Sequence, residues 1–287
     1  MTTTILQKFG LGLLWLYIAL LLAWWMLHLL LGDTIWWLGL ISSFVPLLLA
    51  PLLIFLPLAG LIRNPLYTSG LLIPLTFFLY YYGPSFLPKT IPAHLDEPAP
   101  LTIMTFNMWA GSHKATTVDL IRQQGLPDIV ALQETTPVLN RLIDREVGDA
   151  YPYRFYEFTD NGRGISTLSR YPLESTRSSL IIDLNCRVFR ATVDPTHHFW
   201  LYNCHPESSN LFNFLGDGRP MNVQIRETFQ MRRRLSQALA EDIAARQEPS
   251  VVVGDFNSTE QSDAYALLRD QLQDAHRQAG WGFGHTF

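Results

Sequence analysis

Long apolar runs separated by short polar breaks fill roughly the first third of the chain. Residues 9–31 hold no Asp, Glu, Lys or Arg and are long enough to cross a hydrocarbon core of about 30 Å. Residues 35–62 are equally apolar but contain three prolines, and residues 66–82 come close to the minimum length for a span. The pattern predicts a transmembrane region over residues 1–83, with one helix in each of the three runs.

The first apolar run has a second interpretation, as a cleaved signal peptide. The apolar part of a signal peptide usually spans about 7–15 residues and precedes a cleavage site of small residues. Residues 9–31 are longer than that and no such site follows them, so an uncleaved helix is favoured. The three runs also lack the ionisable residues that usually mark a transport path. A membrane anchor is therefore favoured over a transporter or a lipid-binding membrane domain.

The few charged residues around the runs predict an orientation. Lys8 and Arg63 fall on one side of a three-pass topology, while Asp33 and Lys89 fall on the other. Because basic residues tend to stay in the cytoplasm, we expect a cytoplasmic N-terminus and an extracytoplasmic domain after the last helix. Prolines recur through residues 84–100, which predicts an extended linker to that domain.

Charged residues become frequent after the linker. The part of the chain up to Glu97 holds equal numbers of strong bases and acids, so the rest carries the whole formal net charge of −4. A protein that binds the nucleic-acid backbone without sequence preference usually presents a basic face, which this balance does not predict. A local basic patch stays open as an alternative, because residues 232–234 are consecutive arginines.

The two cysteines of the chain, Cys186 and Cys204, are too few for a disulfide scaffold and lack metal-ligand spacing. Residues 186–194 and 198–205 read as the two strands of a hairpin. A symmetric register around its turn makes the cysteines diagonal neighbours, near the limit of disulfide reach. The second strand ends in His205, and a lone histidine at a strand end is more often structural than catalytic.

Short apolar runs in the soluble half end in polar residues and predict buried strands. The runs are residues 101–106, 129–132 and 251–253, and the polar residues that follow them are Asn107, Glu134, Asp255 and Asn257. Ligands in layered α/β proteins collect where strands end, and Mg²⁺ prefers carboxylate and amide oxygens. A turn or capping role is the simpler interpretation of each residue alone, but three coincidences together favour a metal site.

Five strings occur in a fixed order along the soluble half. They are TFNM at 105–108, PDIVALQE at 127–134, GISTLSRYPL at 164–173, YNCH at 202–205 and VVVGDFN at 251–257. Their order and spacing resemble the endonuclease/exonuclease/phosphatase superfamily, with its DNase I-like fold. The resemblance implies an α/β fold over residues 101–287. Its architecture would be a four-layer sandwich of two packed mixed sheets flanked by helices, preceded by the transmembrane region.

The resemblance also implies a chemistry, the hydrolysis of a phosphoester with Mg²⁺ or Mn²⁺. It makes Glu134 the main metal ligand and Asn107 its neighbour. Asp255 would orient or deprotonate the attacking water, and Asn257 would steady both that residue and the phosphate. His205 would contact the phosphate. One cation can activate the nucleophile and also neutralise charge on the non-bridging oxygens, so these side chains suit their roles.

Two features of the resemblance remain open. Arg170, in the string SRYP, is either a phosphate ligand or a structural residue of its loop. In the superfamily a further strand carries an Asp–His pair, and a G-x-T-F/W string precedes it. Residues 284–287 resemble that preceding string, so His285 is not the missing histidine. We therefore expect a chain without its last strand, either a fragment of a longer enzyme or a weakly active or inactive protein.

Three functions are compatible with these patterns. The leading one is a membrane-tethered, metal-dependent phosphoester hydrolase whose tether and acidic charge favour a lipid or a small phosphodiester over DNA. The second is a catalytically inactive phosphate-binding module on a membrane anchor. The third is an integral membrane protein whose soluble half is only a scaffold, which the cluster of polar strand ends argues against. No protein partner can be inferred from the sequence.

Overall fold

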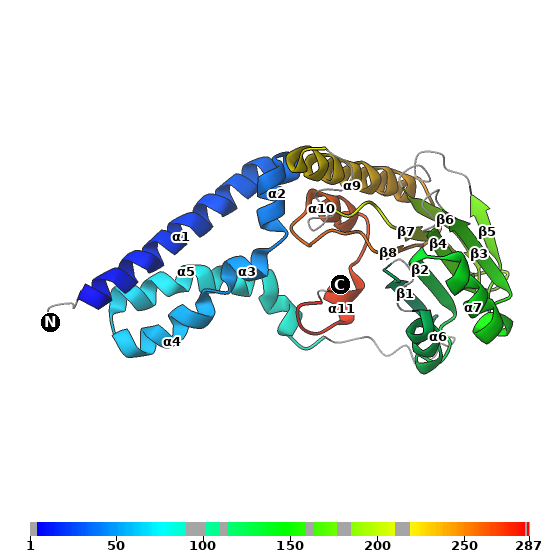
Figure 1. Ribbon diagram of the computed structural model, residues 1–287, viewed down its shortest axis with the longest axis horizontal. Coiled ribbons are helices and arrows are strands. Elements are labelled where there is room, and N and C mark those ends of the chain that lie inside the picture. The colour runs from blue at the N-terminus through cyan, green and yellow to red at the C-terminus, as the bar shows by residue number, and fades with distance from the viewer. Residues whose placement is uncertain are drawn as a thin grey trace. The chain divides into compact units, whose positions relative to one another are not determined.

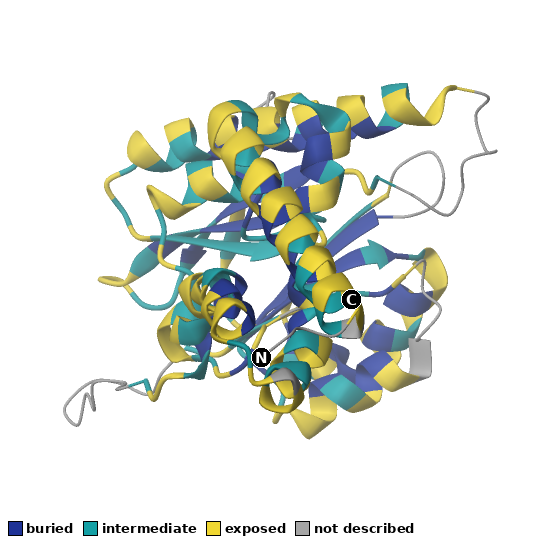
Figure 2. Ribbon diagram, turned by 90° about the vertical axis from the view of Figure 1, so that its left-hand side faces the viewer, coloured by how far each residue is buried: buried dark blue, intermediate teal, exposed yellow. Residues whose placement is uncertain are grey.

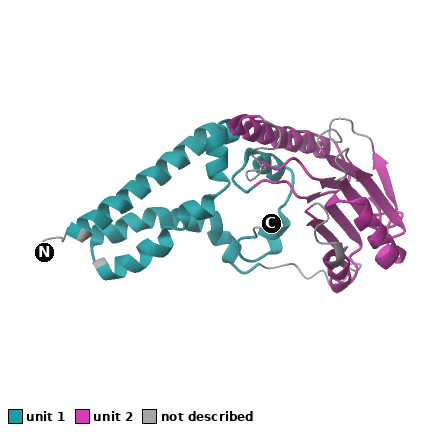
Figure 3. Cartoon of the chain, in the orientation of Figure 1, with its two compact units in different colours: residues 1–93, 259–287 teal, residues 94–258 magenta. Residues whose placement is uncertain are grey.

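The computed structural model divides the chain into two compact units (Figure 3). Unit 1 comprises residues 1–93 and 259–287, and unit 2 comprises residues 94–258. The structure describes residues 5–89, 101–109, 114–158, 164–176, 185–209, 219–284 and 286. Most of the predicted linker and His285 lie outside the described residues. Residues 259–287, which the sequence places in the domain beginning at 101, belong to the helical unit.

Unit 1 is built from helices. They are α1 (Ile5–Leu31), η1 (Gly32–Thr34), α2 (Trp36–Ser42), α3 (Val45–Leu49), α4 (Leu52–Ile62), α5 (Pro65–Tyr82), η2 (Gly83–Phe86), α10 (Asp263–Arg269) and α11 (Ala275–Ala279). The second predicted helix, over 35–62, is thus three helices. Pro46 lies in the first turn of α3 and Pro51 precedes α4, where a missing N–H costs nothing.

Only part of the predicted membrane region meets the requirements of a span. Among the described helices, one segment, Gln7–Thr34, is long and apolar enough to cross a membrane. A second span is formed only if Trp36–Ser42 and Val45–Leu61, bent by 67°, count as one. The third predicted helix exists as α5, but its polar and tyrosine-rich sequence falls below the hydropathy of a span. The described helices therefore give no support to a three-pass arrangement.

The C-terminal segment packs on the helices within unit 1. Asp33 accepts a hydrogen bond from the backbone N–H of Asp263 at 2.9 Å. The ring of Phe283 lies 5.2 Å from that of Tyr82 and 5.1 Å from that of Phe86. Residues distant in sequence from the apolar helices thus help to form one end of this unit.

Unit 2 is a sandwich of two mixed sheets flanked by helices, so the predicted fold class is confirmed (Figure 1). The first sheet has the order β1-β2-β4-β3, and the second has the order β5-β6-β7-β8. The strands are β1 (Ile103–Asn107), β2 (Ile129–Thr135), β3 (Tyr153–Phe158), β4 (Gly164–Ser169), β5 (Leu173–Thr176), β6 (Cys186–Thr192), β7 (His198–Cys204) and β8 (Ser250–Gly254). The helices are α6 (Lys114–Gln123), α7 (Pro137–Val147) and α9 (Met221–Ala244).

The alternation of side chains along β2 explains why it lies between two apolar layers. Ile129 belongs to the core between the sheets, together with Phe189 and Leu201. Val130 and Leu132 point the other way and belong to the core beneath α6 and α7. Figure 2 shows the result, with buried strands inside and exposed outer faces on the helices. A strand buried on both faces is apolar throughout, as residues 129–132 are.

The β6–β7 hairpin places the cysteines directly opposite each other, where they form a disulfide with a Cα–Cα distance of 4.0 Å. The predicted diagonal arrangement is therefore wrong by two residues of register. The reason is the loop, in which Val193 donates its N–H to the carbonyl oxygen of His197. The carboxylate of Asp194 closes this turn by accepting hydrogen bonds from the N–H groups of Thr196 and His197.

Replacing both Cys186 and Cys204 by alanine is expected to lower the free energy of unfolding by about 2–4 kcal/mol, because the crosslink restricts the unfolded chain. The two residues are separated by 18 positions. Urea denaturation of the full chain in detergent, followed by circular dichroism, measures the shift. A reductant should move the wild-type midpoint and leave that of the variant in place. Equal midpoints for both proteins without reductant would contradict the prediction.

Candidate functional site

Three strand ends of unit 2 bring their polar side chains together, as the sequence predicts. Asn107 ends β1, Glu134 lies near the end of β2, and Asp255 follows β8. The side-chain amide nitrogen of Asn107 lies 3.3 Å from Oε1 of Glu134 and 2.8 Å from Oδ2 of Asp255, and donates to both. One amide therefore links the carboxylates delivered by the two sheets.

Strand direction is the reason that these ends meet. β1 and β2 are parallel, with Asn107 opposite Gln133, and β7 and β8 are parallel, with Cys204 opposite Gly254. The carboxyl ends of parallel neighbours lie at the same edge of a sheet. The stacking of the two sheets then places the two edges side by side, with contacts between β1 and β8 and between β2 and β8.

Glu134 owes its direction to an irregularity in β2. The pairing with β4 shifts between Gln133 and Thr135, so Glu134 lies in a β-bulge. Its backbone is in the left-handed region, with a φ of 53°. A bulge interrupts the ladder locally, bends the strand and re-aims one side chain. A non-glycine residue held at positive φ carries a local energetic cost and is typical of functional sites.

The segment after β8 holds Asp255 in place. Gly254 has a φ of 136°, and a Cβ there would lie 1.9 Å from the carbonyl oxygen of Cys204. Asn257, at a φ of 49°, donates its backbone N–H to Oδ1 of Asp255 at 2.9 Å. Its side-chain nitrogen donates to the carbonyl oxygen of Pro206 at 3.0 Å. Asn257 therefore ties the loop after β8 to the residue that follows His205.

His205 joins the cluster from the end of β7. Its Nε2 lies 3.4 Å from Oε1 of Glu134, and its Nδ1 lies 3.3 Å from the backbone carbonyl oxygen of Asp255. Burial lowers the pKa of His205, but the hydrogen bond to Glu134 and the charge of Asp255 outweigh burial and raise it above the ordinary value. The imidazole is thus held between two acceptors and favours its charged form.

The oxygen-bearing side chains of this cluster are of the kind that binds a divalent cation. Mg²⁺ is usually bound through one or two carboxylates and keeps several waters, so it does not need a full protein cage. Glu134 and Asp255 supply two carboxylates, and the partly positive amide NH₂ of Asn107 lies between them. Among the described residues no group of three or more His, Cys, Asp and Glu side chains is placed to hold a metal ion. The two carboxylates suit an open site, at which the amide of Asn107 would have to turn before its oxygen faced the ion.

Arg170 is the one predicted residue that the structure does not bring to this cluster. It follows Ser169, which pairs with Ile129 at the start of β2, so it lies roughly 16 Å along the strand from Glu134. Its guanidinium lies near Asp128, with Nε 3.9 Å from Oδ1, and donates to the carbonyl oxygen of Leu126. These contacts favour the structural interpretation of Arg170.

Changing Arg170 to glutamine is accordingly expected to leave the phosphoester turnover that the family resemblance implies within about threefold of the wild type. The lost contacts with Asp128 and Leu126 should cost under about 1 kcal/mol of stability, because the guanidinium is partly exposed. Steady-state kinetics with a soluble phosphodiester and a thermal melt measure the two effects. A tenfold rise in KM would instead assign Arg170 to the phosphate.

Sequence reasoning missed several residues that support the site. The backbone N–H of Trp109 donates to Oδ1 of Asn107 at 2.8 Å and so orients its amide toward the carboxylates. Gln133 and Asn203 are fully buried beside Glu134 and near His205. The signal for the last two was present, because each is an amide in a strand that is otherwise largely apolar.

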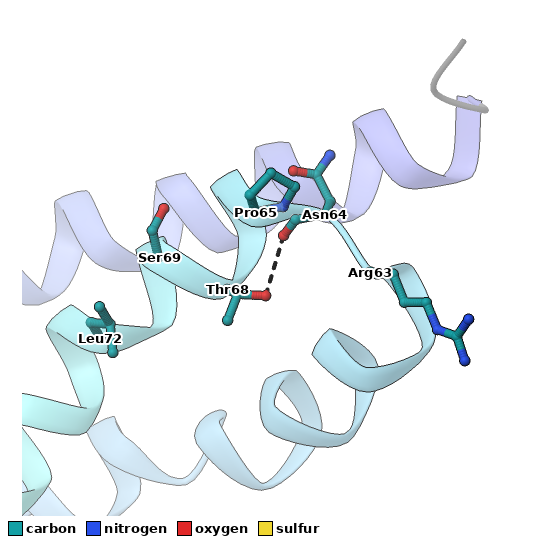
Figure 4. Close-up of a pocket in the computed structure, with 6 residues that line it drawn as sticks. All are labelled: Arg63, Asn64, Pro65, Thr68, Ser69 and Leu72. Carbon is teal, nitrogen blue, oxygen red and sulfur yellow. Dashed lines mark hydrogen bonds between the residues drawn. The ribbon is translucent and has the colours of Figure 1, made fainter. Parts of the chain in front are cut away.

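A pocket of about 560 Å³ opens in unit 1, at the turn between α4 and α5 (Figure 4). It is lined by Arg63, Asn64, Pro65, Thr68, Ser69 and Leu72. Its hydroxyl and amide groups serve the start of α5, since Asn64 caps the helix and Thr68 donates to the carbonyl oxygen of Asn64. The pocket contains none of the predicted site residues, all of which belong to unit 2.

The two stacked mixed sheets, with carboxylates, amides and a histidine at their adjoining edges, define a two-sheet α/β sandwich with a polar site where strands end. Residues 104–287 match the Endonuclease/Exonuclease/phosphatase family, and this match covers more than half of the chain. The chain therefore belongs to that family, a superfamily of phosphoester hydrolases. Comparison with curated protein sequences gives no match.

Solved structures that match part of this chain include a humanized TDP2 of D. rerio, at 17% identity and a TM-score of 0.43, over 58% of this chain. A beta toxin of Staphylococcus aureus has 14% identity and a TM-score of 0.44, over 60% of this chain and 71% of its own. Sphingomyelinase C of Streptomyces griseocarneus has 18% identity and a TM-score of 0.42, over 60% of this chain and 70% of its own. This chain spans 66% of the TDP2 structure.

Proposed function

We propose that this protein is a membrane-tethered, metal-dependent phosphoester hydrolase of the phosphodiesterase, nuclease or phosphatase class. The observation that carries the proposal is the convergence of Asn107, Glu134 and Asp255 from different strands, with His205 against Glu134. A structural cluster would not need two carboxylates, one of them held at positive φ in a bulge. Membership of the family adds the class of reaction.

The proposed roles follow from what each side chain can donate or accept. Asn107 and Glu134 would hold Mg²⁺ or Mn²⁺, which when bound would neutralise charge on the non-bridging phosphate oxygens. Asp255 would orient the attacking water and accept its proton. Its Oδ1 accepts a hydrogen bond from the N–H of Asn257 and its Oδ2 accepts one from the amide of Asn107, and each ionised oxygen keeps a further lone pair that can accept from water. Asn257 would thus keep the proton acceptor in one orientation.

His205 is proposed as a phosphate-binding residue. Its Nδ1 faces a backbone carbonyl oxygen, which sets the ring orientation and leaves Nε2 as the donor toward the cluster. A donor at this position can bind a non-bridging phosphate oxygen and stabilise the charge that develops there. Only about a fifth of the side chain is exposed, so the interaction would occur with little screening by water.

The substrate is proposed to be a lipid or a small phosphodiester. The net charge of −4 works against long nucleic acid, whose binding depends on basic contacts with many phosphates. One apolar helix, Gln7–Thr34, is able to keep the chain at a membrane. The Cys186–Cys204 disulfide supports an extracytoplasmic domain, because disulfides persist in oxidising compartments. Lys8, at the N-terminal end of this helix, favours a cytoplasmic N-terminus, and a single span would then place the domain on the extracytoplasmic side.

Purified protein comprising residues 1–287, in detergent, tests the proposal. Hydrolysis is measured with bis(p-nitrophenyl) phosphate, p-nitrophenyl phosphate, mixed micelles of phosphatidylglycerol and plasmid DNA. We expect diester or lipid cleavage that EDTA abolishes and that Mg²⁺ or Mn²⁺ restores. Binding of inorganic phosphate without cleavage of any substrate would overturn the hydrolase and favour the inactive phosphate-binding module. Preferential cleavage of DNA would keep the hydrolase and reject the substrate class.

A further inference from the structure

A pair of buried amides connects the two sheets of unit 2. Gln133 lies on β2 and Asn203 on β7, and both are fully buried. Nε2 of Gln133 donates to Oδ1 of Asn203 at 2.8 Å. The amide nitrogen of Asn203 in turn donates to the hydroxyl of Thr167 at 3.1 Å and to the carbonyl oxygen of Ser166 at 3.2 Å. We call Gln133 and Asn203 the amide bridge.

Gln133 and Asn203 each lie close to two strand ends that carry residues of the site. Gln133 immediately precedes Glu134, and on the neighbouring strand it pairs with Asn107. Asn203 lies two residues before His205, and on its neighbouring strand it pairs with Val253, two residues before Asp255. One hydrogen bond thus links the strand ends that carry Asn107 and Glu134 to those that carry His205 and Asp255.

Elsewhere the sheets meet mainly through apolar side chains, which include Ile129, Phe189 and Leu201. They also meet through the ion pair of Arg187 on β6 with Glu157 on β3. Apolar burial is non-directional, so it holds the sheets together without specifying how they are aligned. A hydrogen bond between two amides is directional and specifies distance and orientation. The site depends on alignment, because Asn107 must reach Asp255 across the gap between the sheets.

Stability alone gives a poor reason for placing these amides in the core. Burying two amides removes their hydrogen bonds to water, and Oε1 of Gln133 has no hydrogen-bond partner among the described residues. A pair of apolar side chains of similar size would avoid this cost and could be as stable. A polar pair at such a position is better explained by a need to align the two sheets than by a contribution to the stability of the core.

We propose that Gln133 and Asn203 are positioning residues that align the Asn107–Glu134 half of the site with the His205–Asp255 half. They act through the strands and do not touch the substrate. The inference rests on the proposed hydrolase function and extends it by two residues. The proposal predicts that loss of the amide bridge lowers the reaction rate much more than it lowers the stability of the fold. Misplacement of a reacting group by about 1 Å is enough to cost about 100-fold in rate.

The test uses the chain of residues 1–287 in detergent and the double variant Gln133→Met with Asn203→Leu, which removes both amides at similar side-chain size. Unfolding midpoint, Mn²⁺ affinity by electron paramagnetic resonance, and kcat and KM for bis(p-nitrophenyl) phosphate are measured. We expect a midpoint close to that of the wild type, a roughly tenfold or greater loss of Mn²⁺ affinity, and a fall of about 10–100-fold in kcat. The exchange variant Gln133→Asn with Asn203→Gln restores an amide pair and should recover part of the activity.

Ser169→Ala is the matched control, because Ser169 is a fully buried polar residue of β4 at the end of the sheet away from Glu134. It should leave Mn²⁺ affinity and kcat unchanged. A folded double variant with wild-type Mn²⁺ affinity and kcat would overturn the positioning role.

If the double variant does not fold, the same measurements on Asn203→Ser test the positioning role, because the shorter side chain no longer reaches Gln133. Wild-type protein without Mn²⁺ binding or turnover would overturn the hydrolase itself, and the positioning role with it.

Discussion

Replacing Glu134 by glutamine is expected to reduce metal-dependent phosphodiester cleavage by a factor on the order of 10²–10³ or more. Glutamine keeps the size of the side chain and an oxygen that accepts from Asn107, but it removes the negative charge that a hard cation requires. The fold should be preserved, since the bulge and the strand pairing do not depend on that charge. Steady-state kinetics and Mn²⁺ titration measure the two losses.

Glu248→Gln is the matched control for this substitution. Glu248 pairs with Arg190 at the end of the second sheet where β8 begins, and the site lies where β8 ends. The same change of charge there should alter activity by no more than about twofold, as expected of a surface substitution. Equal activity of Glu134→Gln and wild type would remove the metal-ligand role of Glu134.

Replacing Gly254 by alanine is expected to destabilise unit 2 by about 4 kcal/mol or more, which is exceptional for one added methyl group. The added Cβ would lie 1.9 Å from the carbonyl oxygen of Cys204, and the φ of 136° is one that alanine rarely adopts. Relief would require β7 and β8 to move apart just before His205 and Asp255. Yield of folded protein and the urea midpoint measure the effect.

Gly125→Ala is the control that separates the energetic cost of the steric clash from the cost of the positive-φ backbone conformation. Gly125 also has a positive φ, at 74°, but a Cβ there meets nothing within 4 Å. Its substitution should therefore cost only about 1–2 kcal/mol, the usual penalty of the left-handed region. Similar losses for the two variants would show that the contact with Cys204 relaxes at little cost, which contradicts the prediction for Gly254.

The strands and the polar residues at their ends were predictable because their signals are local. A strand such as residues 129–132, buried on both faces, is apolar along its whole length, and the carboxylate that follows it is visible in the sequence. The breaks in the second apolar stretch have equally local causes in Pro46 and Pro51. Composition alone nevertheless predicts a single helix over residues 35–62, because it does not give the direction that the chain takes after a proline.

Other features depended on contacts that no local pattern specifies. The register of the β6–β7 hairpin was set by its loop, which paired Cys186 with Cys204 where a symmetric turn predicted a shift of two residues. The direction of Glu134 came from a bulge whose existence depends on the pairing of β2 with β4. Arg170 belongs to a string that resembles the family pattern, yet the antiparallel pairing carries it to the far end of the sheet.

The sequence by itself determined which residues could form a site. An apolar run forms a strand and a polar residue ends it, and both tendencies act over a few neighbouring positions. Only the tertiary structure decided which of those ends meet. Asn107 and Asp255 are 148 positions apart, and they share a hydrogen bond because two sheets stack with their carboxyl edges adjoining. That stacking combines non-directional apolar burial with directional contacts, the buried amide pair and the Arg187–Glu157 ion pair, and all of them arise between strands distant in the chain.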